Sequence, residues 1–322
     1  MHGRDWPTFD SWDIEVDTDD PPDDLAALAA DVENPAEGFF GRGSMTWHIN
    51  RENAMYLAGV TAALLQLGHP KVAAGVADHS DFSEDPTGRF IRTFEIVDSI
   101  VFADVDTALE AAMVVRRIHD WVTGELQEEV GPFEAGEPYE ANTEENLLWV
   151  HATLLDQSIV AYETFVGDLT DDEKGEYYQE AKVFGQLFGV PRELYPETLG
   201  DFWEYYEREL EETVAVGSRG TEQRDLLLEA SVVPGLSRLR VLRPVQGFFG
   251  AATMPEPARA EFELEWNDRR QRIYDAFAAG VRRLLPYVPY RIRYNRNYRR
   301  NVRRLQESRA AELGADQPRA SR

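Results

Sequence analysis

The feature that most constrains this chain is a succession of helix-start signals without any sustained alternation of apolar and polar residues. Asp or Thr stands before several apolar-rich stretches, as an N-cap residue does, and glycine or proline follows most of them. Helices are therefore expected at 51–67, 86–103, 106–129, 143–167, 170–189 and 198–212. The sequence predicts an all-α fold, a single large helical bundle.

Cysteine is absent from all 322 residues. This excludes disulfides, iron–sulfur clusters, thiolate zinc sites, covalently attached c-type haem and Cys-ligated haem. Any metal or haem iron must be held by His, carboxylate, Tyr or Met side chains.

The charge is large and unevenly placed. The net charge is −26, and it divides into −36 over residues 1–267 and +10 over residues 268–322. An acidic body of this kind argues against nucleic acid as a partner, because nucleic-acid binding depends on neutralising phosphates. Only three of the 33 basic residues are Lys. A Lys-poor acidic surface indicates a halophilic protein, working where salt screens the self-repulsion.

Composition divides the chain into three regions: an acidic, irregular lead-in at 1–38, a helical domain at 39–290 and an Arg-rich tail at 291–322. The first residues lack the apolar core of a signal peptide, and the longest apolar-rich stretch, 57–68, is too short to cross a membrane. These features favour a cytoplasmic protein. The tail is either a solvated segment that offsets the acidic body or a weak peripheral contact to anionic lipid.

Two histidines lie within expected helices, His119 and His151. Each is in line with mostly apolar residues three and four positions apart. The residues in line with His119 are Ala112, Val115, Val122 and Leu126. A buried imidazole must be hydrogen-bonded or must ligate something. Each histidine is therefore either a satisfied core residue or a ligand.

Arg89, Arg92 and Thr93 share one face of the helix expected after Pro86. Two guanidiniums and a hydroxyl together suit a carboxylate, a haem propionate or dioxygen. The alternative is a surface salt-bridge cluster, which is natural in so acidic a protein.

An ordered set of short elements carries a family resemblance over residues 39–210, and it fades toward residue 290. The elements are Trp47, Arg51-Glu52, Leu64-Leu65-Gln66, His69-Pro70, Gly75-Val76, His79-Ser80-Asp81-Phe82, Asp85-Pro86, Arg89, Arg92-Thr93, His119, Val122, Gly124, Tyr139-Glu140-Ala141-Asn142, Leu148-Trp149-Val150-His151 and 162–165. In this order and with these gaps they resemble the haem oxygenase family of the latex clearing proteins and the MpaB oxygenase of mycophenolic acid biosynthesis.

The resemblance implies a helical bundle that encloses a pocket for non-covalent haem b. His119 matches the proximal iron ligand of the rubber-cleaving members. Arg89 and Thr93 match the distal Arg-x-x-Lys-Thr pattern, in which Arg92 replaces the Lys. Since Arg practically never deprotonates, Arg92 is assigned to a haem propionate rather than to iron. His151 and His69 are expected to line the pocket.

The function implied by the resemblance is a haem-b-dependent oxygenase that cleaves a C=C bond of a small hydrophobic substrate with dioxygen. An isoprenoid is the first candidate. Rubber cleavers are secreted and the fungal MpaB is membrane-anchored, so the expected substrate is neither rubber nor the fungal one. The family's catalytic glutamate has no match here. Two other functions remain open: a haem-free helical protein that binds a lipid or a partner, and a haem-binding peroxidase-like or sensory protein.

Overall fold

The computed structural model describes residue 14 and residues 16–79, 86–229 and 243–315. Up to the first strand, the described helices are α1 (Asp23–Ala30), η2 (Pro35–Glu37), α2 (Met45–Asn50), η3 (Asn53–Ala58), α3 (Gly59–Leu67), α4 (Pro70–His79), α5 (Pro86–Phe102) and α6 (Val105–His119). The described strands are β1 (Thr123–Glu125) and β2 (Pro138–Glu140). After them come α7 (Glu144–Phe165), α8 (Asp171–Leu187), η5 (Arg192–Leu194), α9 (Leu199–Glu212), α10 (Ser218–Glu229), α11 (Arg243–Ala252), α12 (Glu256–Glu261), α13 (Asp268–Leu284), η7 (Leu285–Tyr287), α14 (Tyr290–Arg293) and α15 (Arg296–Ala315).

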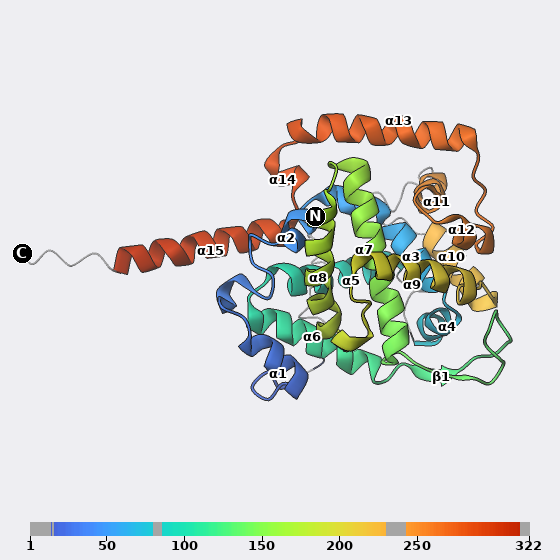
Figure 1. The fold of residues 1–322 in the computed structure, drawn as a ribbon, viewed down its shortest axis with the longest axis horizontal. Helices are drawn as coiled ribbons and strands as arrows, with labels where there is room; N and C mark the ends of the chain where they lie inside the picture. Colours follow the sequence, from blue (N-terminus) through green and yellow to red (C-terminus); the bar gives the residue numbers. More distant parts are fainter. Residues whose placement is uncertain (1–13, 15, 80–85, 230–242, 316–322) are drawn as a thin grey trace, which may run out of the picture.

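Helices dominate the described part of the chain, and its sheet is a single two-stranded hairpin, so the all-α prediction is confirmed. The long helices α7 and α8 run through the middle of the molecule, with α6 and α1 at one end and α13 across the other (Figure 1). One apolar cluster of the core joins α7 to α3, α8 and α9, and a second joins α5, α6 and α8.

The predicted N-caps explain where the central helices begin. Thr170 and Thr198 each form a capping box, in which the Thr side chain accepts from the N3 backbone N–H and the N3 carboxylate accepts from the Thr N–H. Thr143 is the N-cap of α7, and α5 starts at Pro86 as predicted. The helix expected at 51–67 is instead divided into the 3₁₀ turn η3 and the shorter helix α3.

The helix predicted at 106–129 was wrong in length, because α6 ends at His119 and the hairpin of β1 and β2 follows. Gly124 pairs with Tyr139 across the hairpin, and a Cβ at Gly124 would collide with the Tyr139 ring. Val122 and Leu126 belong to the small apolar cluster around Tyr139. His119 is therefore the last residue of its helix and does not lie in the middle of an apolar face.

Both ends of the described chain are more ordered than the composition indicated. In the predicted irregular lead-in, α1 buries Leu25 completely, and Asp24 accepts a 2.7 Å hydrogen bond from Arg116. The predicted tail also contacts the body. The first half of α15 lies against α5 and buries Leu305, while its second half projects away from the body (Figure 1).

No helix in the described ranges is both long enough and apolar enough to cross a membrane.

Candidate functional site

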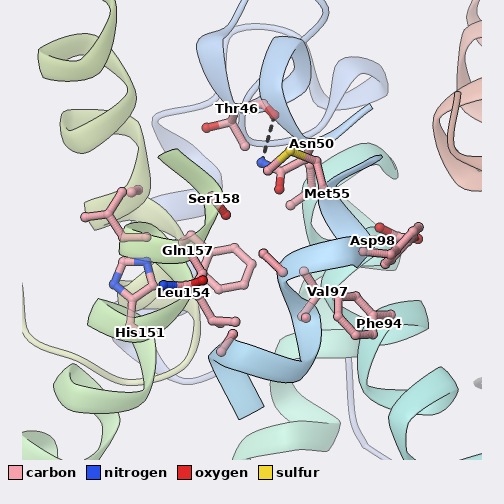
Figure 2. Close-up of a pocket in the computed structure, with 18 of the residues that line it drawn as sticks. Thr46, Asn50, Met55, Phe94, Val97, Asp98, His151, Leu154, Gln157 and Ser158 are labelled. Carbon is pink, nitrogen blue, oxygen red and sulfur yellow. Dashed lines mark hydrogen bonds between the residues drawn. The ribbon is translucent and has the colours of Figure 1, made fainter. Parts of the chain in front are cut away.

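A cavity of about 90 Å³ lies between α5, α7 and the η3–α3 segment. Most of its wall is apolar. The apolar lining includes Met55, Ala58, Ala62, Phe94, Val97, Val101, Leu154, Leu155 and Phe184. The lining also contains His151 and Asp98. These two side chains lie on opposite sides of the cavity (Figure 2). The cavity can therefore hold an apolar group between two distinct polar ends.

His151 forms the α7 end of the cavity and is held by a tyrosine from outside that helix. Its Nδ1 lies 2.6 Å from the Tyr195 hydroxyl, and its ring stacks on Phe184. Gly185 makes this packing possible, because a Cβ there would overlap the Tyr195 hydroxyl. Burial lowers the pKa of His151 to about 3, so the imidazole is neutral at physiological pH. Since Tyr195 occupies Nδ1, only Nε2 is left for a molecule in the cavity.

Asp98 forms the α5 end, and three donors converge on one of its oxygens. Oδ2 accepts hydrogen bonds from the Tyr56 hydroxyl at 3.0 Å, Asn295 Nδ2 at 2.8 Å and Asn297 Nδ2 at 3.2 Å. Burial nevertheless dominates and raises the pKa of Asp98 to about 6. At neutral pH the cavity therefore has a neutral imidazole at one end and a largely ionised carboxyl at the other.

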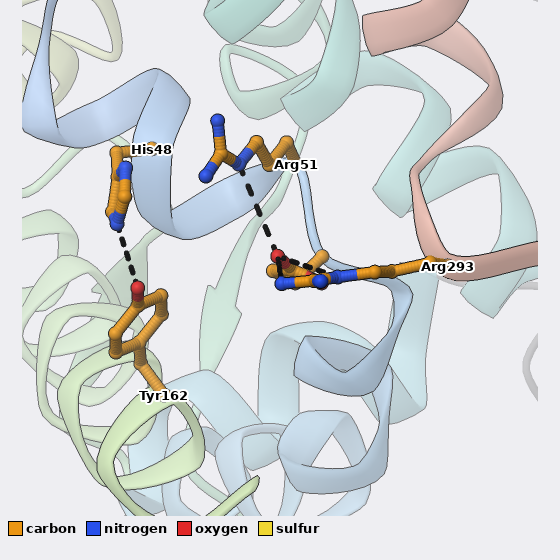
Figure 3. A network of polar contacts seen from close by, with 5 residues as sticks. His48, Arg51, Tyr162 and Arg293 are labelled. Atoms are coloured by element: carbon orange, nitrogen blue, oxygen red, sulfur yellow. Dashed lines mark hydrogen bonds and ion pairs between the residues drawn. The ribbon is translucent and has the colours of Figure 1, made fainter. Parts of the chain in front are cut away.

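A buried ion pair connects this wall to the end of the chain. Glu52 is 1% exposed, and Arg293 binds both of its oxygens at 2.7–3.1 Å. Arg51 approaches the same carboxylate, with its Nε 3.9 Å from Oε1 (Figure 3). Nearby, His48 Nε2 and the Tyr162 hydroxyl lie 2.6 Å apart. The pair fixes α14 in place, so the asparagines that follow it can reach Asp98.

The other predicted site residues gather at the open end of the α5–α6 hairpin. Helix α5 ends at Phe102 and α6 starts at Val105, with only two residues between them. The two packed helices therefore run antiparallel. His119 at the end of α6 therefore lies level with the first turns of α5, which carry Arg92 and Thr93. His119 and Arg92 are half-buried and Thr93 is exposed. Arg89 belongs to the same turns of α5, but its side chain lies outside the described residues.

The open end and the cavity are connected along one face of α5. Thr93, Val97 and Val101 are spaced four residues apart, so they form a single row on the helix. Val97 and Val101 line the cavity, and Thr93 extends the row toward solvent. The residue row that lines the cavity thus begins at the more exposed end of α5.

His69 lies elsewhere, at the junction of α3 and α4. It is 5% exposed, and its ring centroid is 5.2 Å from that of Phe133. Burial lowers its pKa to about 4. His69 is not among the residues that line the cavity. Of the predicted site residues whose side chains are described, the structure brings His119, Arg92 and Thr93 to one end of α5, His151 to the cavity and His69 to neither place.

Sequence reasoning missed Asp98, Tyr195 and Asn295. Asp98 had a visible signal, since it is a lone carboxylate inside the apolar run Ile96-Val97-Asp98-Ser99-Ile100. Tyr195 and Asn295 had none, because each reaches its partner from a segment distant in sequence. In the described ranges, no three His, Asp or Glu side chains come together as a metal-binding group.

Comparison with known proteins gives two similarities. The family model described as "ER-bound oxygenase mpaB/B'/Rubber oxygenase, catalytic domain" matches residues 46–283. Among solved structures, the fold is similar to that of latex clearing protein LCP in the closed state. The TM-score is 0.54 at 16% sequence identity, and the match covers 84% of this chain and 71% of that one. A search of curated proteins finds no match.

Proposed function

Since this chain belongs to the oxygenase family of mpaB and rubber oxygenase catalytic domains, we propose that it uses non-covalent haem b and dioxygen to cleave a C=C bond of a small hydrophobic substrate. The observation that carries the proposal is the shared face of α5, which joins the predicted cofactor residues to an apolar cavity.

The cavity itself is too small for haem. It measures about 90 Å³, whereas sites that enclose drug-sized ligands measure roughly 300–1,000 Å³. The donors at the open end of α5 and α6 do fit haem in kind: a half-buried imidazole at His119, a half-buried guanidinium at Arg92 and a hydroxyl at Thr93. The haem is therefore assigned to the open end, next to the cavity.

In this arrangement His119 would ligate the haem iron and Arg92 would hold a propionate. Arg89 and Thr93 would donate hydrogen bonds to dioxygen. Haem, when bound, supplies the activation of dioxygen. Burial lowers the pKa of His151 to about 3, so its imidazole stays neutral and does not take up a second proton at neutral pH. We therefore assign it to the cavity wall rather than to acid–base chemistry.

The cavity fits one unit of an isoprenoid chain. A dry apolar cavity of roughly 150 Å³ binds benzene, and an isoprene unit has one carbon fewer. At about 90 Å³ this cavity is smaller still, so at most a single unit enters it, against Val97, Val101 and Leu154. The apolar walls exclude water from that unit, while the neighbouring unit lies toward Thr93.

The test is to purify the full-length chain after haem supplementation, record its visible spectrum, and assay dioxygen uptake and carbonyl products with a panel of prenyl compounds. The proposal predicts a Soret band and carbonyl products that require dioxygen. No Soret band after reconstitution would overturn it in favour of a haem-free binding protein. A Soret band without products across the panel would favour a sensory or peroxidase-like protein.

A further inference from the structure

Asp98 has two oxygens with different surroundings. Oδ2 accepts all three of the carboxyl's hydrogen bonds, from Tyr56, Asn295 and Asn297. Oδ1 accepts none from the described residues, although Asp98 is 8% exposed and lines the cavity. The α5 end of a mostly apolar cavity therefore carries one carboxylate oxygen that no described residue uses.

One of the three donors to Oδ2, the side-chain amide of Asn295, cannot become an acceptor. The side-chain oxygen of Asn295 accepts from the backbone N–H of Asn297 at 2.7 Å and of Tyr298 at 3.4 Å, at the start of α15. Its Nδ2 must therefore face Asp98. The backbone N–H of Asn295 also donates to the Arg51 carbonyl at 2.8 Å. The amide groups hold Oδ2, and Oδ1 is left toward the cavity.

We propose that Asp98 Oδ1 binds a hydroxyl group of the substrate, which is thus an isoprenoid alcohol rather than a pure hydrocarbon. A hydrocarbon in the cavity would remove water from Oδ1 and give it no partner, which is costly for a charged oxygen. A hydroxyl donates one hydrogen bond to Oδ1 and places its apolar chain against Phe94 and Val97. The role of Asp98 in recognising a substrate rests on the proposed function. The hydroxyl-binding site itself does not depend on that function.

An alcohol fits this end better than an ammonium group does. Three donors already stabilise the negative charge on Oδ2, so a cation is not needed to balance it. An ammonium has three N–H groups to satisfy. Of the residues that line this end, Phe94, Val97 and Val101 have no acceptor side chain, and the Tyr56 hydroxyl already accepts from Asn295.

Asp156 supplies a matched control. It is also a buried aspartate, 7% exposed, and burial also raises its pKa to about 6. Its Oδ2 accepts from Gln157 at 2.7 Å and from Tyr206 at 2.9 Å. Asp156 is not among the residues that line the cavity. Asp156→Asn therefore repeats the chemical change of Asp98→Asn at a carboxyl group that does not itself line the cavity.

The experiment is a calorimetric titration of the full-length protein with three five-carbon probes: prenol, its aldehyde prenal, and the hydrocarbon methylbutene. For the wild type we expect prenol to bind about tenfold more tightly than methylbutene, as for a hydrogen bond to a charged acceptor. In Asp98→Asn the amide oxygen should take the place of Oδ2, because Asn295 can only donate at this position. The new NH₂ group then faces the cavity.

The variant should therefore reverse the preference. Prenol should fall to within about threefold of methylbutene, and prenal, which can only accept, should become the tightest of the three. Asp156→Asn should keep the wild-type order. The inference is overturned if Asp98→Asn keeps the preference for prenol, which would place the hydroxyl at His151 or Ser158, or if Asp156→Asn changes the order equally.

Should Asp98→Asn fail to fold, an infrared difference spectrum of the wild type decides the matter. Prenol, and not methylbutene, should shift a carboxylate band, and no shift with either ligand overturns the inference. All titrations are run with and without added haem. The preference for prenol without a Soret band would refute the proposed function alone, and a Soret band without the preference would refute this inference alone.

Discussion

The two halves of α5 differ in how they are held. The C-terminal half is buried, with Ile100 and Phe102 fully enclosed and Asp98 bonded to the chain's last helix. In the N-terminal half, Arg92 is half-buried and Thr93 is exposed. One helix thus forms a fixed cavity wall and also carries the predicted cofactor residues. Changes at the fixed half should mainly affect stability, and changes at the open half should mainly affect chemistry.

The largest loss of stability is expected from Arg293→Ala. This change removes the bidentate partner of Glu52, which is 1% exposed, and leaves a buried charge with only the more distant Arg51. Breaking such a pair typically costs about 3–5 kcal/mol of unfolding free energy. Urea denaturation measures it. The control is Arg291→Ala, an exposed arginine two residues earlier, which should change stability by less than about 0.5 kcal/mol. Equal effects of the two would show that the end of the chain does not hold the wall.

The second expected effect is a pH dependence of the unfolding free energy. Folded Asp98 keeps its proton up to a pKa of about 6, while in the unfolded chain it is released near 3.8. Between these values the folded state binds more protons, so stability falls as pH rises and is constant above the folded pKa. The shift corresponds to about 3 kcal/mol. The titratable neighbours that act on Asp98 are Tyr56 and Glu95, and its α15 contacts are neutral amides.

Asp98→Asn should remove the loss of stability that occurs as pH rises. Relative to wild type, the variant should gain up to about 3 kcal/mol between pH 4 and pH 7. Unfolding free energies measured in urea across this range provide the check. A difference between the two proteins that is constant with pH would mean that Asp98 is already ionised at pH 4.

A smaller loss, about 2 kcal/mol, is expected from Asn295→Ala. The substitution removes both the cap of α15 and one of the three donors to Asp98. Asn297→Ala, which removes only the 3.2 Å bond, should cost less than about 1 kcal/mol. Thermal unfolding of the two variants, measured in parallel, gives the order of the two losses. A larger loss in Asn297→Ala than in Asn295→Ala would contradict the assignment of Asn295 as the main anchor.

Changes in the N-terminal half of α5 should affect chemistry more than stability. Thr93→Val replaces an exposed residue by one of nearly equal size, so unfolding free energy should change by less than about 1 kcal/mol. We expect haem to be retained and turnover to fall at least tenfold, since the hydroxyl is assigned to the distal side. Stopped-flow and steady-state assays on an identified substrate test this. Full activity in Thr93→Val would remove this residue from the proposed chemistry.

The sequence predicted well what depends on local signals. Thr170 and Thr198 begin their helices as expected, because a capping box needs only residues three apart. The sequence prediction failed where residues far apart in the chain determine the structure. Helix α6 stops at His119 because the following residues pair in a hairpin with 138–140, and the Arg-rich end is held by carboxylates far away in sequence, at Glu52 and Asp98. The Tyr195–His151 contact likewise joins residues 44 positions apart.

The difference between His119 and His151 tests the central claim most directly. Both were predicted from similar patterns, but His151 is fixed by Tyr195 in the cavity wall, whereas His119 ends α6, which packs against the helix that carries Arg92 and Thr93. The measurement is the visible spectrum and haem content of His119→Ala and His151→Ala, purified in parallel after haem supplementation. The account predicts that His119→Ala loses the Soret band and that His151→Ala keeps it. A wild-type Soret band in His119→Ala, or loss of the band only in His151→Ala, would contradict it.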